Sequence, residues 1–555
     1  MTRNWWKEAI AYQVYPRSFM DSNGDGIGDL QGIISKLDYL KDLGIDVIWI
    51  CPMYKSPNDD NGYDISDYQD IMDEFGTMED FTQLLSEVHA RGMKLIIDLV
   101  INHTSDEHQW FIESKSSKDN PKRDWYVWRD GKDGKEPNNW ESIFNGSAWQ
   151  LDEESGQYYL HIFSTKQPDL NWENPEVRTA LYDMINWWLD QGIDGFRVDA
   201  ISHIKKDQTF SDMQNDTDQP YIHAWEKYMN VDGIQPFLEE LKQETFSKYD
   251  IMTVGEANGV SVDEIDQWVG EVNGKFNMVF QFEHLGLWDA EGKKTLDIKG
   301  LKNVLTRWQK GLENNGWNAL FIENHDKARI VSTWGNDKEY WYESATSIAA
   351  MYFFMQGTPF IYQGQEIGMT NVQFASIEEY NDVAIKGMYA SKMSEGKTHE
   401  EIMDIIWSSS RDNSRTPMQW SAEQNAGFSS GTPWIGINPN YVEINVENQL
   451  KDEQSIYHFY KKMIQLKKSQ DVFTYGTYDL LLPDHEFVYA YSRTLGDEQV
   501  IVISNLGATS VSVDKMAERA FEFDNLLLTN KDVQPHEAMH SFEMAPFETR
   551  IYKMN

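Results

Sequence analysis

Asp194-Gly195-Phe196-Arg197-Val198-Asp199-Ala200 reads as a buried strand that ends by presenting an arginine and a carboxylate. Because side chains alternate along a strand, Arg197 and Asp199, two positions apart, point to the same face. A guanidinium so close to a carboxylate favours its ionised form, so we expect the pKa of Asp199 to be lowered. An isolated pair of this kind is more often structural, and its meaning therefore depends on the rest of the chain.

Three further apolar runs end in polar residues in the same way. Lys94–His103 ends in a histidine, Ile251–Ala257 ends in Gly-Glu-Ala with Glu256, and Ala319–Asp326 ends in Asn-His-Asp. Each polar end on its own could merely cap a helix or satisfy a turn. Four of them together predict one site, because the carboxyl ends of parallel strands meet on one side of a sheet.

Strand-like runs alternate with amphipathic helices over most of the chain. The predicted strands span residues 9–16, 47–52, 94–103, 195–200, 251–257, 276–282, 319–326 and 359–366, and the helix patterns include 30–43, 78–91, 175–191, 339–356 and 455–469. Apolar residues recur in the helices at spacings of three and four, and glycines such as Gly44 and Gly192 follow their ends. Eight β-then-α units predict an α/β fold, a (β/α)8 TIM barrel with its active site at the carboxyl ends of the strands.

Three stretches interrupt this alternation. Residues 104–172 hold six tryptophans and no barrel unit, residues 208–233 are polar and irregular, and residues 367–420 form a long excursion that carries Arg411. Short strands and turn signals follow from about residue 475. We therefore predict a catalytic barrel from residues 1–103 and 173–474 (domain A), a small inserted domain B at 104–172 and a C-terminal β-sandwich, domain C, at 475–555.

The composition is that of an acidic chain with one cysteine. Its formal net charge of −41 argues against nucleic-acid and anionic-membrane partners, because phosphate groups would be repelled. Cys51 excludes intrachain disulfides, and its apolar surroundings predict an inert thiol in a reducing compartment. The first residues show no signal-peptide pattern, and no apolar run is long enough to span a bilayer. We expect a cytoplasmic monomer that binds a small neutral substrate.

The polar strand ends suit one kind of chemistry. A retaining glycosidase requires two carboxyl groups about 5 Å apart, one ionised and one protonated. Asp199 fits the nucleophile because a neighbouring arginine favours its charge. Glu256 has no cation beside it in the sequence, and its apolar strand favours the raised pKa of a general acid. Asp326 could bind sugar hydroxyls and stabilise a cationic transition state, while His103 and His325 could donate hydrogen bonds.

With these motifs the chain resembles an α-glucosidase of the α-amylase superfamily, glycoside hydrolase family 13, in its oligo-1,6-glucosidase and dextran-glucosidase group. The matching segments are spread over essentially the whole chain and read DLVINH (98–103), QPDLN (167–171), GFRVDA (195–200), VGEA (254–257) and FIENHD (321–326). One departure follows Asp326, where the chain reads Lys327-Ala328-Arg329 and the group usually has a proline before the arginine. We expect this difference to alter the loop and to leave the catalytic acid unaffected.

The resemblance implies a role for each of these residues. Asp199 would be the nucleophile, Glu256 the acid/base and Asp326 the stabiliser of the transition state. It also implies sugar contacts from Tyr63, His103, Arg197 and His325, with Phe163 and Gln167 nearby. The implied reaction is retaining, proceeds through a covalent glucosyl-aspartate intermediate and allows transglucosylation.

Two further residues bear on whether the protein acts from the end of a glucan chain. In similar exo-acting enzymes an aspartate and an arginine pair across the pocket floor and bind the 4-hydroxyl group of the non-reducing end. Asp60, in the run from Asn58 to Tyr63, and Arg411, in Arg411-Asp412-Asn413, match that pattern. The alternative is a turn aspartate and a surface arginine. We predict exo action, with release of α-glucose from the non-reducing end.

Ala200 carries the prediction of linkage. Similar α-1,6-preferring enzymes usually have valine after the nucleophile, and the smaller alanine leaves room for an α-1,4-linked sugar on the leaving-group side. Asn258, two residues past the acid, could add a polar contact there. We expect hydrolysis of α-1,4-linked maltose and maltooligosaccharides. The alternative is α-1,6 hydrolysis, as in an oligo-1,6-glucosidase or a dextran glucosidase.

The loop Asp21-Ser22-Asn23-Gly24-Asp25-Gly26-Ile27-Gly28-Asp29 is a candidate metal site. Oxygen-bearing side chains at positions one, three, five and nine, with glycine at six, follow a calcium-binding loop. Position twelve is Gly32, so the glutamate of an EF-hand is missing, and an Asp-Gly turn without metal is the alternative. The resembling enzymes hold Ca²⁺, or sometimes Mg²⁺, in the equivalent loop. The resemblance thus implies structural Ca²⁺ bound by Asp21, Asn23, Asp25, the Ile27 carbonyl and Asp29.

Other functions of the same fold stay open. A sucrose- or trehalose-type isomerase or a transglucosylase would share the three acids and differ in how water enters. A trehalose-6-phosphate hydrolase would need a cationic phosphate pocket, which the sequence does not reveal. A catalytically silent transporter subunit would need an anchoring helix and broken catalytic positions, whereas this chain keeps Asp199, Glu256 and Asp326.

Overall fold

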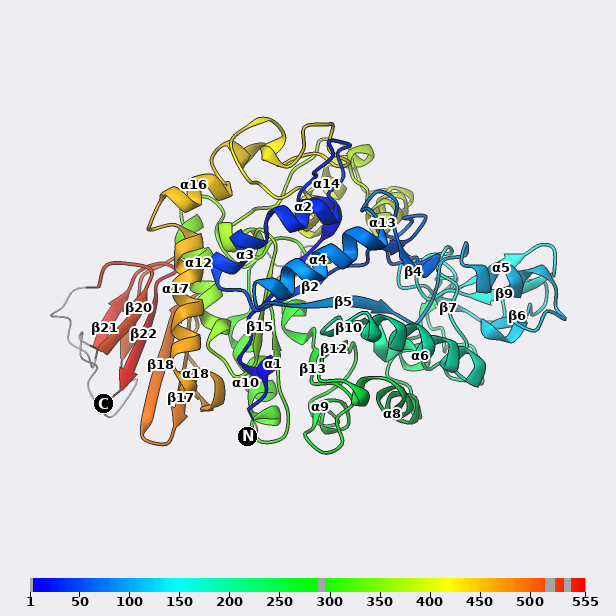
Figure 1. The fold of residues 1–555 in the computed structure, drawn as a ribbon, viewed down its shortest axis with the longest axis horizontal. Coiled ribbons are helices and arrows are strands. Elements are labelled where there is room, and N and C mark those ends of the chain that lie inside the picture. Colours follow the sequence, from blue (N-terminus) through cyan, green and yellow to red (C-terminus); the bar gives the residue numbers. More distant parts are fainter. Residues whose placement is uncertain (1–2, 288–294, 515–524, 534–540, 555) are drawn as a thin grey trace.

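The centre of the molecule is a nearly closed barrel of eight parallel strands (Figure 1). The computed structural model describes residues 3–287, 295–514, 525–533 and 541–554. The barrel strands are β1 (Ala11–Val14), β2 (Val47–Ile50), β5 (Lys94–Val100), β10 (Gly195–Asp199), β12 (Met252–Glu256), β13 (Met278–Phe280), β14 (Ala319–Leu320) and β15 (Thr358–Tyr362). Their order is β13-β12-β10-β5-β2-β1-β15-β14, and a parallel bridge between Val279 and Asn318 brings the two edges together. The predicted TIM barrel is confirmed, with every predicted strand in it.

The strands are short and buried on both faces, which is why they read as continuous apolar runs. All five residues of β10 are buried, and β10 pairs in parallel with β5 on one side and β12 on the other. Its first residue has to be glycine: Gly195 has φ +141, and an added Cβ would meet the Met252 carbonyl oxygen at 1.8 Å. The strand that carries Arg197 and Asp199 is therefore held close to its neighbour.

Helices surround the barrel as the spacing of apolar residues predicts. They include α2 (Leu30–Ser35), α3 (Leu37–Leu43), α4 (Met78–Ala90), α6 (Pro175–Asp190), α8 (Ile234–Glu244), α10 (Ile298–Leu312), α12 (Trp341–Phe353) and α17 (Ile456–Ser469). The single helix predicted over 30–43 is instead two helices, because Lys36 leaves the helical conformation with φ −110 and ψ 2. Gly44, with φ 105, ends α3 in the left-handed conformation expected of a helix-terminating glycine.

The segment between β5 and α6 projects from the barrel at the right of Figure 1. It contains α5 (Gln109–Ser116) and a three-stranded antiparallel sheet of β6 (Trp128–Asp130), β9 (Gln157–Leu160) and β8 (Trp149–Asp152). The loop predicted over 208–233 packs into it: β11 (Ile222–His223) pairs with β7 (Trp140–Glu141), and Phe210 and Tyr228 join the apolar cluster around Trp140. The inserted segment thus shares its core with a loop that the sequence presents as separate.

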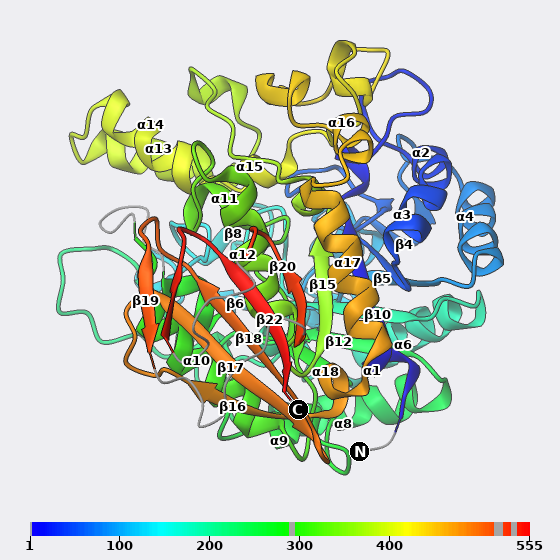
Figure 2. The same ribbon diagram turned by 90° about the vertical axis from the view of Figure 1, so that its left-hand side faces the viewer.

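The excursion after β15 contains a helical hairpin that lies on the upper side of Figure 2. The hairpin is formed by α13 (Val383–Ser394) and α14 (His399–Ser409), and it is followed by α15 (Asp412–Arg415) and later by α16 (Val446–Lys451). Its two ends, at residues 382 and 411, return to the same place, beside the carboxyl ends of the barrel strands. Residues 382 and 411 therefore lie beside the predicted site although their segment lacks the alternating pattern of the barrel.

The C-terminal part forms two antiparallel sheets. One contains β16 (Thr477–Leu481), β17 (Val488–Leu495), β18 (Glu498–Asn505), β22 (Thr549–Met554) and β20 (Leu526–Thr529), and the other β19 (Val511–Asp514) and β21 (Ser541–Met544). Ile501, Val513 and Phe542 belong to one buried cluster between the sheets, which accords with the predicted sandwich. Parts of the predicted domain, residues 515–524, 534–540 and 555, lie outside the described residues.

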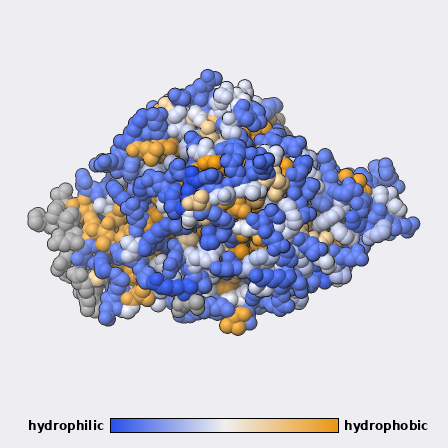
Figure 3. Space-filling view, in the orientation of Figure 1, coloured by the Kyte–Doolittle hydropathy of each residue, from blue (hydrophilic) through white to orange (hydrophobic). Residues whose placement is uncertain are grey.

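The visible surface is mostly hydrophilic, as the charge of the chain leads one to expect (Figure 3). Apolar residues on this face are scattered rather than gathered in one large patch. Among the helices of the described ranges, none combines the length and the apolar character that crossing a bilayer requires.

Candidate active site

One guanidinium holds three carboxylates at the carboxyl ends of β5, β10 and β12. Arg197 Nη1 lies 2.8 Å from Asp98 Oδ1 and 2.6 Å from Asp199 Oδ1, and Arg197 Nη2 lies 2.8 Å from Glu256 Oε2. The register explains the cluster, because Arg197 is paired with Asp98 on β5 and with Val254, two residues before Glu256, on β12. The predicted shared face of Arg197 and Asp199 is confirmed, and Glu256 reaches the same arginine.

The expected effect of Arg197 on the pKa of Asp199 is wrong in its net direction. Burial raises the pKa of Asp199 well above the ordinary aspartate range; Arg197 lowers it, and the carboxylates of Glu256 and Asp98 raise it further. The sequence places no cation beside Glu256, but the fold brings Arg197 into direct contact with it. Burial likewise raises the pKa of Asp98, although Arg197 lowers it, so the shared guanidinium does not bring the pKa of either aspartate below its usual range.

Ala200 links the two candidate catalytic carboxylates through its backbone. It has φ 44 and ψ 31, a left-handed conformation that is uncommon outside glycine. In this conformation its N–H donates to Glu256 Oε2 at 2.9 Å. Backbone strain of this kind persists where the surrounding structure holds it, often at functional sites. The residue directly after Asp199 therefore also fixes Glu256 beside it.

Asp326 lies among cations. Its Oδ2 is 3.0 Å from His325 Nε2, and its Oδ1 is 2.7 Å from Arg415 Nη2 and 3.3 Å from Arg411 Nη1. Burial raises the pKa of Asp326, but His325, Arg411 and Arg415 outweigh burial and hold that pKa well below its usual range. Burial lowers the pKa of His325, but Asp326 and Cys51 together outweigh burial and raise that pKa to about 10. Both groups are therefore charged at neutral pH.

A second set of predicted sugar contacts lies beside Asp60. Gln167 Nε2 donates to Asp60 Oδ2 at 3.2 Å and lies 3.2 Å from His103 Nε2, which is 3.2 Å from the Tyr63 carbonyl oxygen. The Tyr63 hydroxyl is 2.7 Å from His325 Nε2, and the two rings stack. Burial lowers the pKa of His103 to about 3, so its imidazole is neutral. The structure thus joins Tyr63, His103, Gln167 and His325 in one group around the acids.

The predicted pair of Asp60 and Arg411 is formed. Arg411 Nη2 lies 3.3 Å from Asp60 Oδ1, and the guanidinium lies 5.2 Å from the centre of the Phe144 ring. Burial raises the pKa of Asp60 above its usual range, although Arg411 and Arg415 lower it. The alternative of a turn aspartate and a surface arginine does not hold, because the Asp60 side chain is 7% exposed and the Arg411 side chain 16%.

Two predicted residues lie at the edge of this group. The Phe163 ring centre is 5.2 Å from that of His103 and 5.6 Å from that of Phe144, so Phe163 borders the site. Asn258 is half-buried in the turn that follows β12, and its contact with a sugar stays a prediction. At the departure after Asp326, Lys327 is exposed, and its carbonyl accepts a hydrogen bond from the Ser414 hydroxyl.

Asp98, Phe144, Asp382 and Arg415 belong to the site and were missed from the sequence. Asp98 stands in a recognised motif, and the alignment of β5 beside β10 would have marked it as the partner of Arg197. Arg415 follows Arg411 by four residues, so one turn of helix places both on the same side. Asp382 shows only the pattern of a helix cap, and nothing local to it indicates an active site.

The loop at 21–29 is formed as a series of turns that its own side chains stabilise. Asp21 accepts hydrogen bonds from the N–H groups of Asn23, Gly24 and Gly26 and from the Ser429 hydroxyl. Asp29 accepts the Gly32 N–H at 2.6 Å and so caps α2. Within the ranges that are described, no three or more Asp, Glu, His or Cys side chains gather as metal ligands do. Calcium binding stays a prediction.

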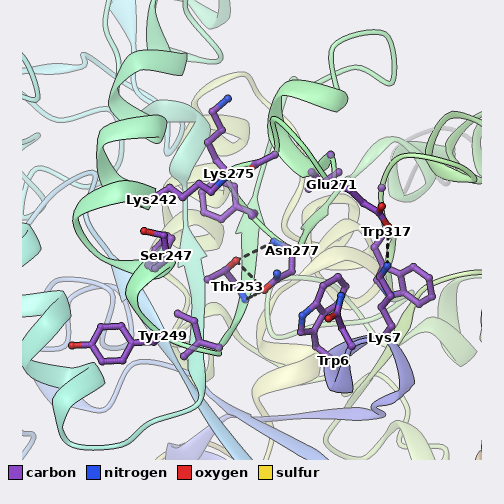
Figure 4. Close-up of a pocket in the computed structure, with 18 residues that line it drawn as sticks. Trp6, Lys7, Lys242, Ser247, Tyr249, Thr253, Glu271, Lys275, Asn277 and Trp317 are labelled. Carbon is purple, nitrogen blue, oxygen red and sulfur yellow. Dashed lines mark hydrogen bonds and ion pairs between the residues drawn. The ribbon is translucent and has the colours of Figure 1, made fainter. Parts of the chain in front are cut away.

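A cavity of about 390 Å³ opens at the opposite end of the barrel (Figure 4). Its lining comes from α1 (Trp5–Glu8) and from residues that precede β12, β13 and β14. Lys7 Nζ lies 3.3 Å from Glu271 Oε1, Lys242 donates to the Gly274 carbonyl, and Lys275 donates to the Asn273 carbonyl. The lysines on this cavity are thus already engaged by the protein, and none of the predicted site residues lines it.

Comparison with known proteins agrees with the motifs. A family model described as the catalytic domain of alpha amylase matches residues 13–476. A relative from Bacillus subtilis (strain 168), named "Probable oligo-1,6-glucosidase 3", is 58% identical over 552 residues, which cover 100% of both chains.

Two solved structures have the same fold over their whole length. A trehalose-6-phosphate hydrolase from Bacillus licheniformis has a TM-score of 0.93 at 45% identity and covers 99% of this chain and 100% of its own. An isomaltulose synthase from Klebsiella sp. LX3 has a TM-score of 0.95 at 44% identity and covers 100% of both chains. The three relatives are named for different activities, so similarity alone does not select a substrate.

Proposed function

Because this chain belongs to the α-amylase family and is a glycoside hydrolase of the α-glucosidase kind, we propose that it removes single glucose units, with retention of configuration, from the non-reducing ends of short α-linked oligosaccharides. One observation supports this most directly. The carboxylates of Asp199 and Glu256 each contact one terminal nitrogen of the Arg197 guanidinium. Arg411 contacts both Asp60 and Asp326. An ion pair that closes one side of a sugar-binding site would favour the end of a chain over its middle.

In the first step Asp199 would attack the anomeric carbon while Glu256 protonates the departing glycosidic oxygen. The C1–O bond breaks, a C1–Oδ bond forms, and the leaving sugar takes the proton of Glu256. This requires Asp199 ionised and Glu256 protonated; the contact with Arg197 favours the ionised form of Asp199 against the effect of burial on its pKa. The backbone N–H of Ala200 donates to Glu256 and keeps it beside the bond that breaks.

In the second step Glu256 would take a proton from water, whose oxygen attacks C1 and releases Asp199. When a sugar hydroxyl replaces water, the same step transfers glucose to another sugar. Asp326, ionised among His325, Arg411 and Arg415, would stabilise the positive charge that develops on the sugar ring. His103 and Gln167 would donate hydrogen bonds to its hydroxyl groups.

The linkage has two candidates, each supported by a different observation. The name of the Bacillus subtilis relative supports α-1,6 hydrolysis, and this stands first because the relative is similar over the full length. The α-1,4 preference expected from Ala200 is not supported by that name. It remains a second candidate because a methyl side chain next to Asp199 leaves more room on the leaving-group side than a branched one. Initial rates on maltose, isomaltose, trehalose and sucrose, with product analysis, would separate these candidates from the isomerases.

Ala200→Val tests the role of this position in linkage. If Ala200 admits an α-1,4-linked leaving group, the added methyl groups should lower the ratio of maltose to isomaltose rates by roughly tenfold or more. Valine is strained at φ 44, so the variant should also be less stable. A misfolded fraction of the enzyme lowers the maltose and isomaltose rates by the same factor, so it does not change their ratio. Ala200→Ser provides the control of similar size, and an unchanged ratio in the valine variant would remove Ala200 as a determinant.

We also propose that the loop at 21–29 binds Ca²⁺ and stabilises the fold without taking part in catalysis. Four oxygen-bearing side chains within nine residues support this proposal. A chelator should lower the melting temperature by several degrees, and added Ca²⁺ should restore it, because a ligand that binds only the folded state stabilises that state. Asp25→Ala should remove the response. A melting temperature that is the same with chelator and with Ca²⁺ would argue against the site.

A further inference from the structure

Asp382 is the residue that holds Arg411 most closely. Arg411 Nη2 lies 2.5 Å from Asp382 Oδ1, and Arg411 Nε lies 3.0 Å from Asp382 Oδ2. The carboxylate therefore makes a bidentate contact with the Nε–Nη2 edge of the guanidinium. The Asp382 side chain is 0% exposed. The two other carboxylates on Arg411, those of Asp60 and Asp326, are each 3.3 Å away. A two-point contact fixes the plane of a guanidinium, which single longer contacts do not.

The carboxylate of Asp382 is itself held in place. Its Oδ1 accepts the Ala384 N–H at 3.0 Å and so caps the start of α13. The Asp412 side chain accepts the N–H groups of Asn381 and Asp382 at 2.7 and 3.0 Å. These contacts tie the chain just before the α13–α14 hairpin to the chain just after it. Asp382 and Arg411 therefore meet at the base of the hairpin, where Arg411 also contacts Asp326.

The geometry determines what Arg411 can still bind. With its Nε–Nη2 edge on Asp382, the guanidinium directs Nη1 to Asp326 and the remaining proton of Nη2 to Asp60. The Phe144 ring lies beside it at 5.2 Å. Burial raises the pKa of Asp382, but Arg411, Arg415 and the Ala384 N–H together keep that pKa below its usual range, which favours the charged form of the anchor. Without this anchor, a flexible arginine would be drawn to whichever of the other acids is ionised.

We propose that Asp382 is a positioning residue, which fixes Arg411 so that the pocket recognises the non-reducing end of the substrate. The inference rests on the proposed function, and it adds that exo recognition depends on the base of the α13–α14 hairpin. Asp382 is buried behind Arg411 and acts through that residue. Its removal should therefore weaken sugar binding only as long as Arg411 is present.

A double-mutant cycle tests this dependence. Asp382→Asn keeps the size of the side chain and removes its charge, and it should raise KM for a disaccharide by roughly tenfold with a smaller change in kcat. The dissociation constant for glucose, measured by calorimetry, should rise in parallel. In the Arg411→Ala background the same substitution should change the glucose dissociation constant by less than about twofold. Asp404→Asn, on the exposed side of α14, is the matched control and should leave both constants unchanged.

The possible outcomes distinguish a positioning role of Asp382 from a purely structural role, and they distinguish its failure from failure of the proposed function. A loss of glucose affinity that is equally large with and without Arg411 would show that Asp382 only supports the fold, and it would overturn the proposal. Assays are run below the melting temperature of every variant, so that unfolding does not enter. A wild-type protein that neither cleaves any α-glucoside nor binds glucose would refute the proposed function itself. An active wild type with no effect of Asp382→Asn would refute only the role of Asp382.

Discussion

Asp199→Ala is expected to abolish turnover, with kcat lower by about 10⁴-fold or more, because it removes the atom that attacks the sugar. The variant should still fold, since the substitution also removes one of three carboxylates that compete for Arg197. Initial rates on an aryl α-glucoside measure the loss, and the melting temperature controls for folding. A variant within tenfold of the wild-type rate would show that Asp199 is not the nucleophile.

Azide offers a second measurement on the same variant. A small anion can enter the space left by the carboxylate and attack the anomeric carbon from that side, while Glu256 still protonates the leaving group. The product should then be the β-glucosyl azide, because only one displacement occurs instead of two. Glu256→Ala, in which the nucleophile is intact, is the matched control and should give the α-azide. An α-azide from Asp199→Ala together with a β-azide from Glu256→Ala would reverse the assignment of the two residues.

Arg411→Ala is expected to lower kcat/KM on disaccharides by about 10²- to 10³-fold. The substitution leaves the buried carboxylates of Asp60 and Asp382 without their shared cation, and breaking a buried ion pair in this way costs about 3–5 kcal/mol. Part of this cost should appear as a lower melting temperature and part as weaker binding of glucose. Steady-state kinetics on maltose and isomaltose, together with thermal unfolding, measure the two parts.

Arg411→Lys separates charge from geometry. Lysine keeps the positive charge but cannot contact two carboxylate oxygens with one planar group. We expect it to recover most of the stability and only part of the lost activity. Near-normal turnover of short substrates by Arg411→Ala would mean that the pair with Asp60 does not form the closed side of the pocket.

The parts of the site that were predicted correctly are those set by local periodicity. Alternation along β10 places Arg197 and Asp199 on one face, and the polar ends of β12 and β14 follow from the βα repeat. The pKa of Asp199 was not predictable in this way. It depends first on burial and then on Glu256 and Asp98, which lie about sixty and about a hundred residues away in the chain and become neighbours only when the barrel forms.

The sequence by itself determined the barrel and the three candidate acids, because these follow from apolar periodicity and from motifs within single strands, and its resemblance to exo-acting enzymes implied the Asp60–Arg411 pair. The tertiary structure decided how charge is shared among them. Arg197 holds three carboxylates and not one, and Arg411 is fixed by Asp382, across the base of the α13–α14 hairpin. The physical reason is that Coulomb interactions depend on distance and burial, and both are set by how strands and loops remote in the chain are packed.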